Sequence, residues 1–269
     1  MSYQYQGQAV PALIDFSATV APGEHVAVVG ANGSGKSTLA GLAACLLLPT
    51  AGEVLIAGVK SDRVRQDLSL RRKVGLVLQN PDNQIVAATV EEDVAFGLEN
   101  LGVPREEMWR RVEEALSVTG MEELRLCPPH QLSGGQKQRL ALAGILAMRP
   151  EVIILDEPTA MLDPVGRREI IQWLLRIKAC APVTIMYITH HLEETLVADR
   201  VWLLQKGRLA ADLPPLALYT QNRELVEQAG LSLPPLLELV HRLERGGVPL
   251  PAGIAQIEQL VDALCRLLS

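Results

Sequence analysis

"EHVAVVGANGSGKSTLAGLAACLLLP", from Glu24 to Pro49, contains an apolar run, a glycine-rich loop and a second apolar run, in that order. The first run is short, rich in valine and ends at Gly30, which favours a buried strand. The second favours a helix that continues to Pro49. Between them, Gly30 to Ser37 fit the pattern G-x4-G-K-S. In this position, after a strand and before a helix, the pattern predicts a phosphate-binding loop, or P-loop.

Each part of the P-loop has a physical role. Its glycines let backbone N–H groups point at phosphate oxygens, and the following helix presents its positive end to the same anions. Lys36 adds a mobile positive charge, and the Ser37 hydroxyl can ligate Mg²⁺. The alternative, a glycine-rich turn with a solvated lysine, is disfavoured by the strand–loop–helix context. The predicted nucleotide-binding residues of the loop are Asn32, Gly33, Ser34, Gly35, Lys36, Ser37 and Thr38.

Three further apolar runs end in polar residues, which is typical of parallel strands buried on both faces. They are Lys73 to Gln79, Glu151 to Glu157 and Pro182 to His190. Ligands of such sheets bind at the carboxyl ends of the strands. The sequence therefore predicts an α/β fold, a P-loop NTPase core with a mostly parallel sheet.

The strand-end residues are predicted to complete a phosphoryl-transfer site. Asp156 is placed to hold Mg²⁺ through its water shell, and Glu157 to orient and deprotonate the attacking water. Gln79 is a candidate for contacting the metal and the water, and His190 for hydrogen-bonding the γ-phosphate. The alternative, that these are exposed residues at loop starts, is weaker beside Lys36. ATP and Mg²⁺ are thus the expected ligands.

Between about residues 81 and 150 the pattern becomes helical, which predicts a helical subdomain inserted into the α/β core. Thr89 and Glu92 fit a capping box at the start of one of its helices. The subdomain also contains "LSGGQ", where Ser133 and Gln136 fit a helix capping box. Capping does not explain Gly134 and Gly135, because glycine in a helix costs about 1 kcal/mol relative to alanine unless something must approach the backbone. We expect an anion here. A second cradle in another subdomain is explained most simply by two chains, head to tail, that sandwich two ATPs.

From about Leu213 onward, prolines divide the chain into three short helical segments. We therefore predict two domains, an ATPase domain over residues 1–212 and a C-terminal helical region over 213–269. The role of this region stays open, and a contact within a dimer is one candidate.

Composition limits the location and the partners. The N-terminal "MSYQYQGQ" lacks the basic and apolar regions of an export signal, which predicts a cytoplasmic location. The longest apolar stretch, Leu39 to Leu48, is far shorter than the roughly 18 residues of a membrane span. A net charge of −6 argues against nucleic-acid binding, since phosphate neutralisation requires a basic face.

The order of the P-loop, Gln79, "LSGGQ", "LDE", "MLD" and Thr189-His190 resembles that of an ABC-type ATPase, from about Tyr5 to Gly207. The resemblance implies that the signature Ser133 to Gln136 binds nucleotide across a dimer, with Ser133, Gly134 and Gly135 at the partner's γ-phosphate. It implies that Asp163 crosses the dimer seam and that His190 is the switch histidine. It also implies an aromatic residue stacked on adenine, for which Tyr5 is the better match and Tyr3 the alternative.

"QNPDNQIVAATVEEDVAFGLENLG", Gln79 to Gly102, closely resembles the ATPase components of energy-coupling factor (ECF) transporters. The resemblance implies uptake of a vitamin or a transition-metal ion, energised from the cytoplasmic face of the membrane. It implies a second ATPase subunit, a transmembrane T component and a substrate-binding S component. The T component would bring arginines to the acidic Glu91, Glu92 and Asp93. "PTAMLDP" mixes features of the family's two paralogue types, and His-His replaces the common His-Asp, so a homodimer and a paralogue heterodimer both stay open.

Two other classes fit less well. A soluble ABC ATPase of DNA repair would have a long coiled coil between P-loop and signature, and one of translation would normally carry two ATPase modules. A non-hydrolysing regulatory module would lack the catalytic carboxylate, whereas Glu157 is in place. The transported substrate is left open, because a different polypeptide selects it.

Overall fold

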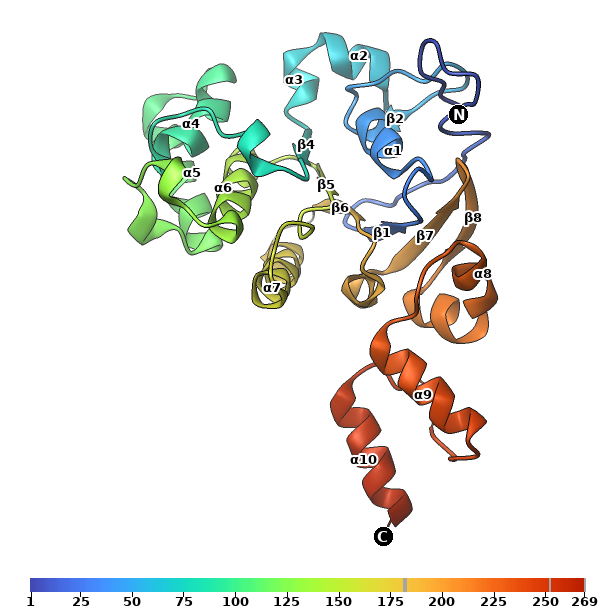
Figure 1. The fold of residues 1–269 in the computed structure, drawn as a ribbon. Helices are drawn as coiled ribbons and strands as arrows, with labels where there is room; N and C mark the ends of the chain where they lie inside the picture. Colours follow the sequence, from blue (N-terminus) through green and yellow to red (C-terminus); the bar gives the residue numbers. More distant parts are fainter. Residues whose placement is uncertain (181–182, 252, 269) are drawn as a thin grey trace.

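The computed structural model describes residues 1–180, 183–251 and 253–268 (Figure 1). Its centre is a six-stranded sheet in the order β4-β5-β6-β1-β7-β8. All neighbours are parallel except β7 and β8, so the predicted mostly parallel sheet is confirmed. The strands are β1 (His25–Val29), β4 (Val74–Val77), β5 (Val152–Asp156), β6 (Thr184–Ile188), β7 (Arg200–Gln205) and β8 (Arg208–Leu213). Pro182 of the predicted fourth strand and Ser269 lie outside the described residues.

Four strands were not predicted. Two of them, β2 (Leu55–Ile56) and β3 (Val59–Lys60), form a separate antiparallel pair. The other two, β7 and β8, form a hairpin at the edge of the main sheet, and the φ angles of Lys206 (49°) and Gly207 (77°) in its turn are both positive. Two positive φ angles give a tight turn whose twist matches that of the flanking strands.

The helices cover both faces of the sheet. On one face α1 packs on Val26 and Val28 of β1, and on the other α7 covers β5 and β6 while C-terminal segments cover β1 and β7. The helices are α1 (Lys36–Ala43), α2 (Ser61–Gln66), α3 (Leu68–Arg71), α4 (Val90–Asn100), α5 (Arg105–Thr119), α6 (Gly134–Ala147), α7 (Pro164–Cys180), α8 (Arg223–Gln228), α9 (Pro235–Arg245) and α10 (Ile257–Leu268).

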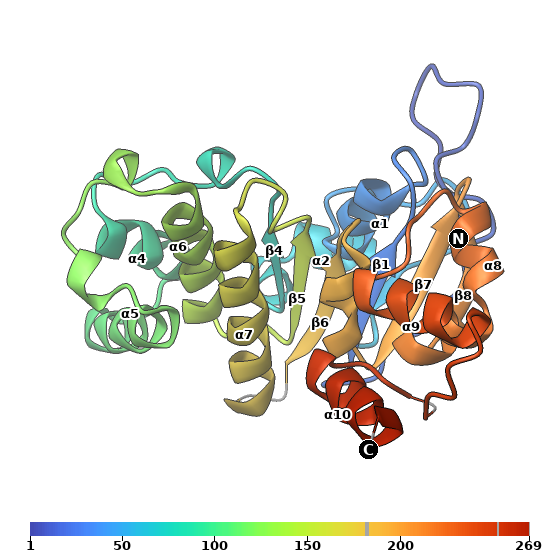
Figure 2. The same cartoon turned by 60° about the horizontal axis from the view of Figure 1, so that its bottom comes forward.

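Helices α4, α5 and α6 bury a core of their own, beside the β4–β5 edge of the sheet (Figure 2). The predicted capping boxes Thr89–Glu92 and Ser133–Gln136 are confirmed at the starts of α4 and α6. Helices α9 and α10 share a further small core. The domain boundaries, at 81–150 for the insert and 213–269 for the C-terminal region, stay predictions.

Helix α1 does not continue to Pro49, as predicted, but ends in a Schellman motif around Cys45. Cys45 has a φ of 59°, and its N–H donates to the Leu42 carbonyl at 3.1 Å. The next residue's N–H donates to the Gly41 carbonyl at 2.9 Å. This is the usual way in which a helix end satisfies its last carbonyls, but the left-handed position normally holds glycine. A cysteine at this position gives no signal in the sequence that the helix ends there.

Among the described residues, no helix combines the length and hydrophobicity needed to cross a membrane.

His25, in the central strand, predicts a pH-dependent stability. It is 2% exposed, and burial, followed by the charge of Lys178, lowers its pKa to about 4. Between pH 6.5 and 4 the unfolded chain therefore binds a proton that the folded protein excludes, so stability falls as the pH falls through this range. From pH 7 to pH 5 the loss is about 2 kcal/mol, since one pKa unit corresponds to about 1.4 kcal/mol.

Denaturant unfolding of the wild type and of His25→Phe at both pH values tests this. The phenylalanine keeps an aromatic ring against Tyr187, whose ring lies edge-on to His25 at 6.2 Å. We expect the free energy of unfolding of the variant to fall less than that of the wild type, by about 2 kcal/mol. Equal losses would show that His25 does not carry the effect.

Candidate active site

An open cavity of about 1070 Å³ lies at the carboxyl end of β1 and brings most of the predicted site residues together. They come from the N-terminal loop, the P-loop and the ends of β4, β5 and β6. The predicted residues that line the cavity are Tyr5, Asn32, Gly33, Gly35, Lys36, Ser37, Thr38, Gln79, Glu157 and His190.

Two P-loop positions require glycine, because backbone atoms of other segments lie too close to them for a side chain. A Cβ on Gly30 would lie 2.4 Å from the Leu204 carbonyl oxygen, and one on Gly35, whose φ is 105°, would lie 2.6 Å from the Ala12 carbonyl oxygen. Ser34 is the predicted loop residue that does not line the cavity. Its N–H donates to the Ala31 carbonyl, and its hydroxyl is buried without a partner among the described residues.

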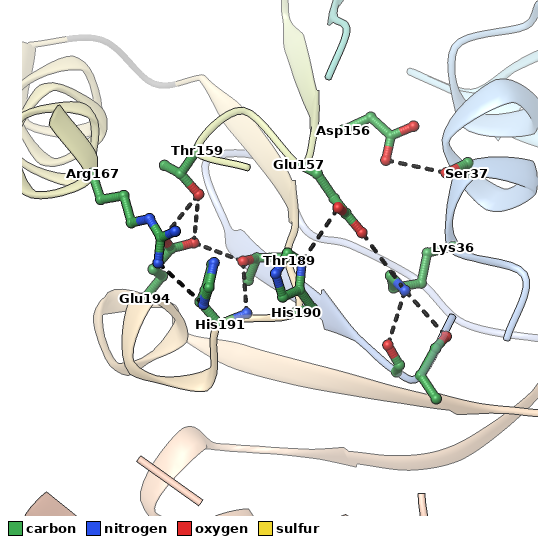
Figure 3. Close-up of polar contacts among 12 residues, drawn as sticks. Lys36, Ser37, Asp156, Glu157, Thr159, Arg167, Thr189, His190, His191 and Glu194 are labelled. Atoms are coloured by element: carbon green, nitrogen blue, oxygen red, sulfur yellow. Dashed lines mark hydrogen bonds and ion pairs between the residues drawn. The ribbon is translucent and has the colours of Figure 1, made fainter. Parts of the chain in front are cut away.

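Lys36 lies between the P-loop and the strand-end carboxylates. Its Nζ donates to the carbonyl oxygens of Gly30 at 2.9 Å and Ala31 at 3.2 Å, and lies 3.8 Å from Glu157 Oε1 (Figure 3). Burial lowers the pKa of Lys36, while the charges of Glu157 and Asp156 raise it. The ammonium is thus anchored where the P-loop and the predicted base meet.

The two consecutive carboxylates at the end of β5, Asp156 and Glu157, point to different partners (Figure 3). Ser37 Oγ donates to Asp156 Oδ1 at 3.4 Å, and Glu157 Oε2 lies 3.3 Å from His190 Nδ1. Burial raises the pKa of Asp156, an effect partly opposed by the Ser37 hydrogen bond. The backbone of Glu157 is left-handed, with φ 49°. Strained backbone of this kind is typical of active sites.

The two candidate adenine-stacking residues differ in their surroundings. Tyr5 lines the cavity, and its hydroxyl lies 3.2 Å from Thr38 Oγ1. Tyr3 packs edge-on against the Tyr5 ring, with the ring centroids 4.9 Å apart. This arrangement favours Tyr5 as the residue that meets the nucleotide.

The signature Ser133–Gln136 lies at the start of α6, apart from this cavity. Ser133 N–H donates to Gln136 Oε1 at 2.8 Å, and Gln136 N–H donates to Ser133 Oγ at 3.3 Å. A Cβ on Gly134 would meet only the Met161 carbonyl oxygen, at 3.9 Å, and one on Gly135 only a Leu162 methyl, at 3.8 Å. Both are ordinary contacts, so packing among the described residues does not require glycine at either position.

Asp163 also lies away from the cavity, on the surface before α7. Its Oδ1 accepts a hydrogen bond of 2.7 Å from the Gly166 N–H, which is the arrangement of a helix N-cap. Its predicted role across a dimer seam is not needed to explain this contact and stays a prediction.

Sequence reasoning missed two parts of the site. The segment Gly230–Leu233, between α8 and α9, lines the cavity although it belongs to the predicted C-terminal region. A buried carboxylate, Glu194, accepts hydrogen bonds from hydroxyls beside His190 and Glu157. The only signal for Glu194 was its place shortly after a strand-end threonine, in "THHLEE".

A P-loop after β1 that faces two carboxylates at the carboxyl end of β5 defines a P-loop nucleoside triphosphatase. Comparison with known proteins narrows this class. The family model "ABC transporter" matches residues 13–160. The energy-coupling factor transporter ATP-binding protein EcfA1 of Caldanaerobacter subterraneus is 47% identical over 97% of this chain and 94% of its own length. The protein of the same name from Symbiobacterium thermophilum is 50% identical, over 92% and 86%.

Solved structures agree. The structure of cbiO1 from Clostridium perfringens, described as part of the ABC transporter complex cbiONQ, has a TM-score of 0.77 and 37% identity, covering 89% of this chain and 96% of that chain. The dimeric ATP-binding cassette MJ0796 with ADP and Pi has a TM-score of 0.70 and 32% identity, covering 80% and 95%. The chain therefore belongs to the ABC transporter family and, within it, to the ATPase subunits of energy-coupling factor transporters. Its ATP hydrolysis is coupled to transport.

Proposed function

We propose that this subunit hydrolyses Mg·ATP at sites shared by two ATPase chains, and so drives uptake of a vitamin or a transition-metal ion through a T component and an S component. The observation that carries the shared site is the separation of its two halves. The P-loop and Glu157 line one cavity, whereas the signature lies in the helical subdomain, with two glycines that packing among the described residues does not require. A second ATPase subunit, either another copy or a paralogue, would bring its signature to this cavity.

The proposed roles follow from the contacts. Lys36 and the loop N–H groups would hold the phosphates, Tyr5 the adenine, and His190 the γ-phosphate. Glu157 would accept the proton of the attacking water. The hydroxyl of Ser37 and the carboxylate of Asp156 lie 3.4 Å apart, and such hard oxygen donors fit Mg²⁺. With Gln79 they would hold this ion, which would neutralise charge on the phosphates.

Gly135→Ala tests the shared site with a variant that the chain itself tolerates. Alanine is a better helix former than glycine by up to about 1 kcal/mol, so the free energy of unfolding should stay equal or rise. Hydrolysis should nevertheless fall at least tenfold, because the methyl group would meet the partner's nucleotide, and loss of close backbone hydrogen bonds to an anion has that size. Chemical denaturation and steady-state ATPase assays measure the two effects.

A matched control is Gly144→Ala, later in the same helix, where a Cβ would meet nothing within 4 Å. It should raise stability by up to about 1 kcal/mol, for the same reason, and leave hydrolysis unchanged. If Gly135→Ala hydrolysed ATP at the wild-type rate, the signature would not approach a nucleotide in the manner proposed.

We further propose that the subunit sits peripherally on the cytoplasmic face of the membrane, where arginines of the T component meet the acidic first turn of α4. Each of these acidic residues also has a partner within the chain. Glu91 Oε2 accepts from Arg125 Nε at 2.8 Å, and Glu92 Oε2 from the Thr89 N–H at 3.1 Å. Asp93 Oδ1 accepts from two backbone N–H groups, at 2.7 and 3.0 Å. Charge reversal would therefore disturb the local fold as well as docking.

Amide substitutions separate these effects. In the double variant Glu92→Gln, Asp93→Asn the amide oxygens can still accept the backbone hydrogen bonds, since glutamine also completes a capping box. Only the negative charge is removed. We expect at least about tenfold weaker binding of the T component, the size measured for close interfacial charge pairs, with unchanged basal ATPase. Stability should fall by no more than about 1 kcal/mol per charge, because negative charges favour the start of a helix.

The matched control is Glu106→Gln, an exposed residue in the first turn of α5. Copurification of the T component from membranes and a titration of its affinity measure the outcome. An unchanged complex with the double variant would eliminate this docking surface.

A further inference from the structure

The carboxylate of Glu194 is the centre of a buried hydrogen-bond cluster beside the active site. Glu194 belongs to the short 3-10 helix η4 (Leu192–Val197) and is 5% exposed. Its Oε2 accepts from Thr189 Oγ1 at 2.6 Å and from the Tyr187 hydroxyl at 2.8 Å. Thr159 Oγ1 lies 2.8 Å from Oε1 and 3.0 Å from Oε2 (Figure 3). One carboxylate therefore gathers three hydroxyl groups.

These hydroxyls compensate the burial of a charge. A buried carboxylate is costly unless it accepts hydrogen bonds, and bonds to a charged group are stronger than neutral ones. Burial, with the charge of Glu194, raises the pKa of Tyr187 well above its ordinary value, so this hydroxyl stays protonated and able to donate. Apolar residues in place of the whole cluster could fill the same space at no greater cost, so what the charge adds is a fixed direction for its three donors.

Tyr187 belongs to β6, and the other two donors, Thr189 and Thr159, come from the two loops that carry the candidate catalytic groups. Thr189 directly precedes His190, and its Oγ1 also accepts the His191 N–H at 3.0 Å, which fixes the turn after β6. Thr159 lies two residues after Glu157 in the loop after β5. Across the gap between these loops, Glu157 Oε2 and His190 Nδ1 are 3.3 Å apart. Glu194 thus connects, through Thr159 and Thr189, the two loops whose residues Glu157 and His190 meet in the cavity.

We propose that Glu194 is a positioning residue that holds the Glu157 loop and the His190 turn in register for ATP hydrolysis. It acts through Thr159 and Thr189 and touches neither nucleotide nor water itself. This inference rests on the proposed roles of Glu157 and His190. A purely structural role is the alternative, in which Glu194 stabilises the fold but does not affect the geometry of the site.

Glu194→Gln keeps the size of the side chain and removes the charge that orders the three hydroxyls. Because small displacements of reacting groups can cost up to about 100-fold in rate, we expect kcat for ATP to fall about 10- to 100-fold, with KM changed less than about threefold. In a Glu157→Gln background, where the base is already gone, the same change should cost less than about twofold, because coupled groups are not additive. The protein is assayed as the purified dimer with its ATPase partner.

A second pair of variants avoids reliance on one substitution. Thr189→Val keeps the shape but removes the hydroxyl, and should lower kcat about tenfold, whereas Thr189→Ser keeps the hydroxyl and should restore most of the rate. Thr195→Val is the matched control. Its hydroxyl is buried in the same short helix but bonds to the Leu192 carbonyl and Tyr219, away from the site, so it should affect stability and not kcat.

Wild-type kcat in both Glu194→Gln and Thr189→Val would overturn the inference. Equal losses of kcat in the Glu157→Gln background and in the wild-type background would do the same, since they would indicate a general structural effect. A failure of the proposed function is distinguishable, because it would appear as an unchanged rate in Glu157→Gln itself.

Discussion

Replacing Glu157 with glutamine is expected to lower the rate of ATP hydrolysis by about 10² to 10⁴, the usual contribution of a general base. The side chain is 15% exposed and lies between Lys36 Nζ, at 3.8 Å, and His190 Nδ1, at 3.3 Å. Glutamine fills the same space and keeps most hydrogen bonds, but it cannot accept the proton of the attacking water. Nucleotide affinity should therefore survive, and single-turnover hydrolysis together with nucleotide titration would separate the two properties.

The same variant should accumulate as a closed dimer in Mg·ATP but not in ADP. Several charge-assisted hydrogen bonds to the γ-phosphate, at about 1.5 to 3 kcal/mol each, exceed the roughly 5.5 kcal/mol that shifts an equilibrium from 1:99 to 99:1. Light scattering measures the dimer fraction. Glu151→Gln, an exposed residue directly before β5 begins, is the matched control and should behave as the wild type. Equal dimer fractions in ADP and Mg·ATP would contradict closure by the γ-phosphate.

Mixing two inactive variants is expected to restore part of the ATPase activity. Lys36→Ala removes a charge that contacts phosphates in the ground state and the transition state, so both binding and turnover should fall, the latter on the order of 10²-fold or more. Ser133→Arg leaves the chain's own P-loop able to bind ATP but blocks the site that it completes on its partner. In a mixed dimer, one shared site contains both substitutions, because it combines the altered P-loop with the altered signature. The other shared site has a P-loop and a signature that are both wild-type. Activity should therefore partly return.

Ser133→Ala is the control for the lost helix cap. It removes the hydrogen bond from the Gln136 N–H to Ser133 Oγ, at a cost of about 1 kcal/mol, without adding bulk or charge. It should lose the same helix cap as Ser133→Arg but lower hydrolysis less, since it removes only one hydroxyl from the partner's site and adds nothing that blocks it. The mixing experiment requires a homodimer; with a paralogue, each lesion in this chain should disable a different one of the two sites. If mixed dimers form and activity does not return, either the site is not shared or both sites must act together.

Much of the fold was predictable, because its signals are local. The P-loop pattern, the strand-end carboxylates and the two capping boxes depend on neighbouring residues, and the structure has these elements where the sequence indicates them. The end of α1 was not predictable, since the Schellman motif uses Cys45 where glycine is usual. Strands β2 and β3 have only two residues each, too few for a periodic pattern.

The site was predictable only for residues whose type and immediate neighbours in the sequence already indicate their role. Lys36, Asp156 and Glu157 are conspicuous beside glycines or buried strands. The role of Glu194 depends on hydroxyls that come from residues 5 to 35 positions away, and the approach of Gly230–Leu233 to the cavity depends on how the C-terminal region packs on β1 and β7. Contacts between distant parts of the chain leave no periodic trace in a single sequence.

The place of β1 in the sheet has a consequence for how this protein is made. Val28 of β1 pairs with Ile188 of β6 on one side and Trp202 of β7 on the other. Both neighbours of the strand that supports the P-loop are therefore synthesised long after it. At roughly 5 to 20 residues per second, the nascent chain carries an unpaired apolar β1 for on the order of ten to thirty seconds. Until β7 has emerged, β1 is an unpaired apolar segment of the kind that makes incompletely folded chains prone to aggregation.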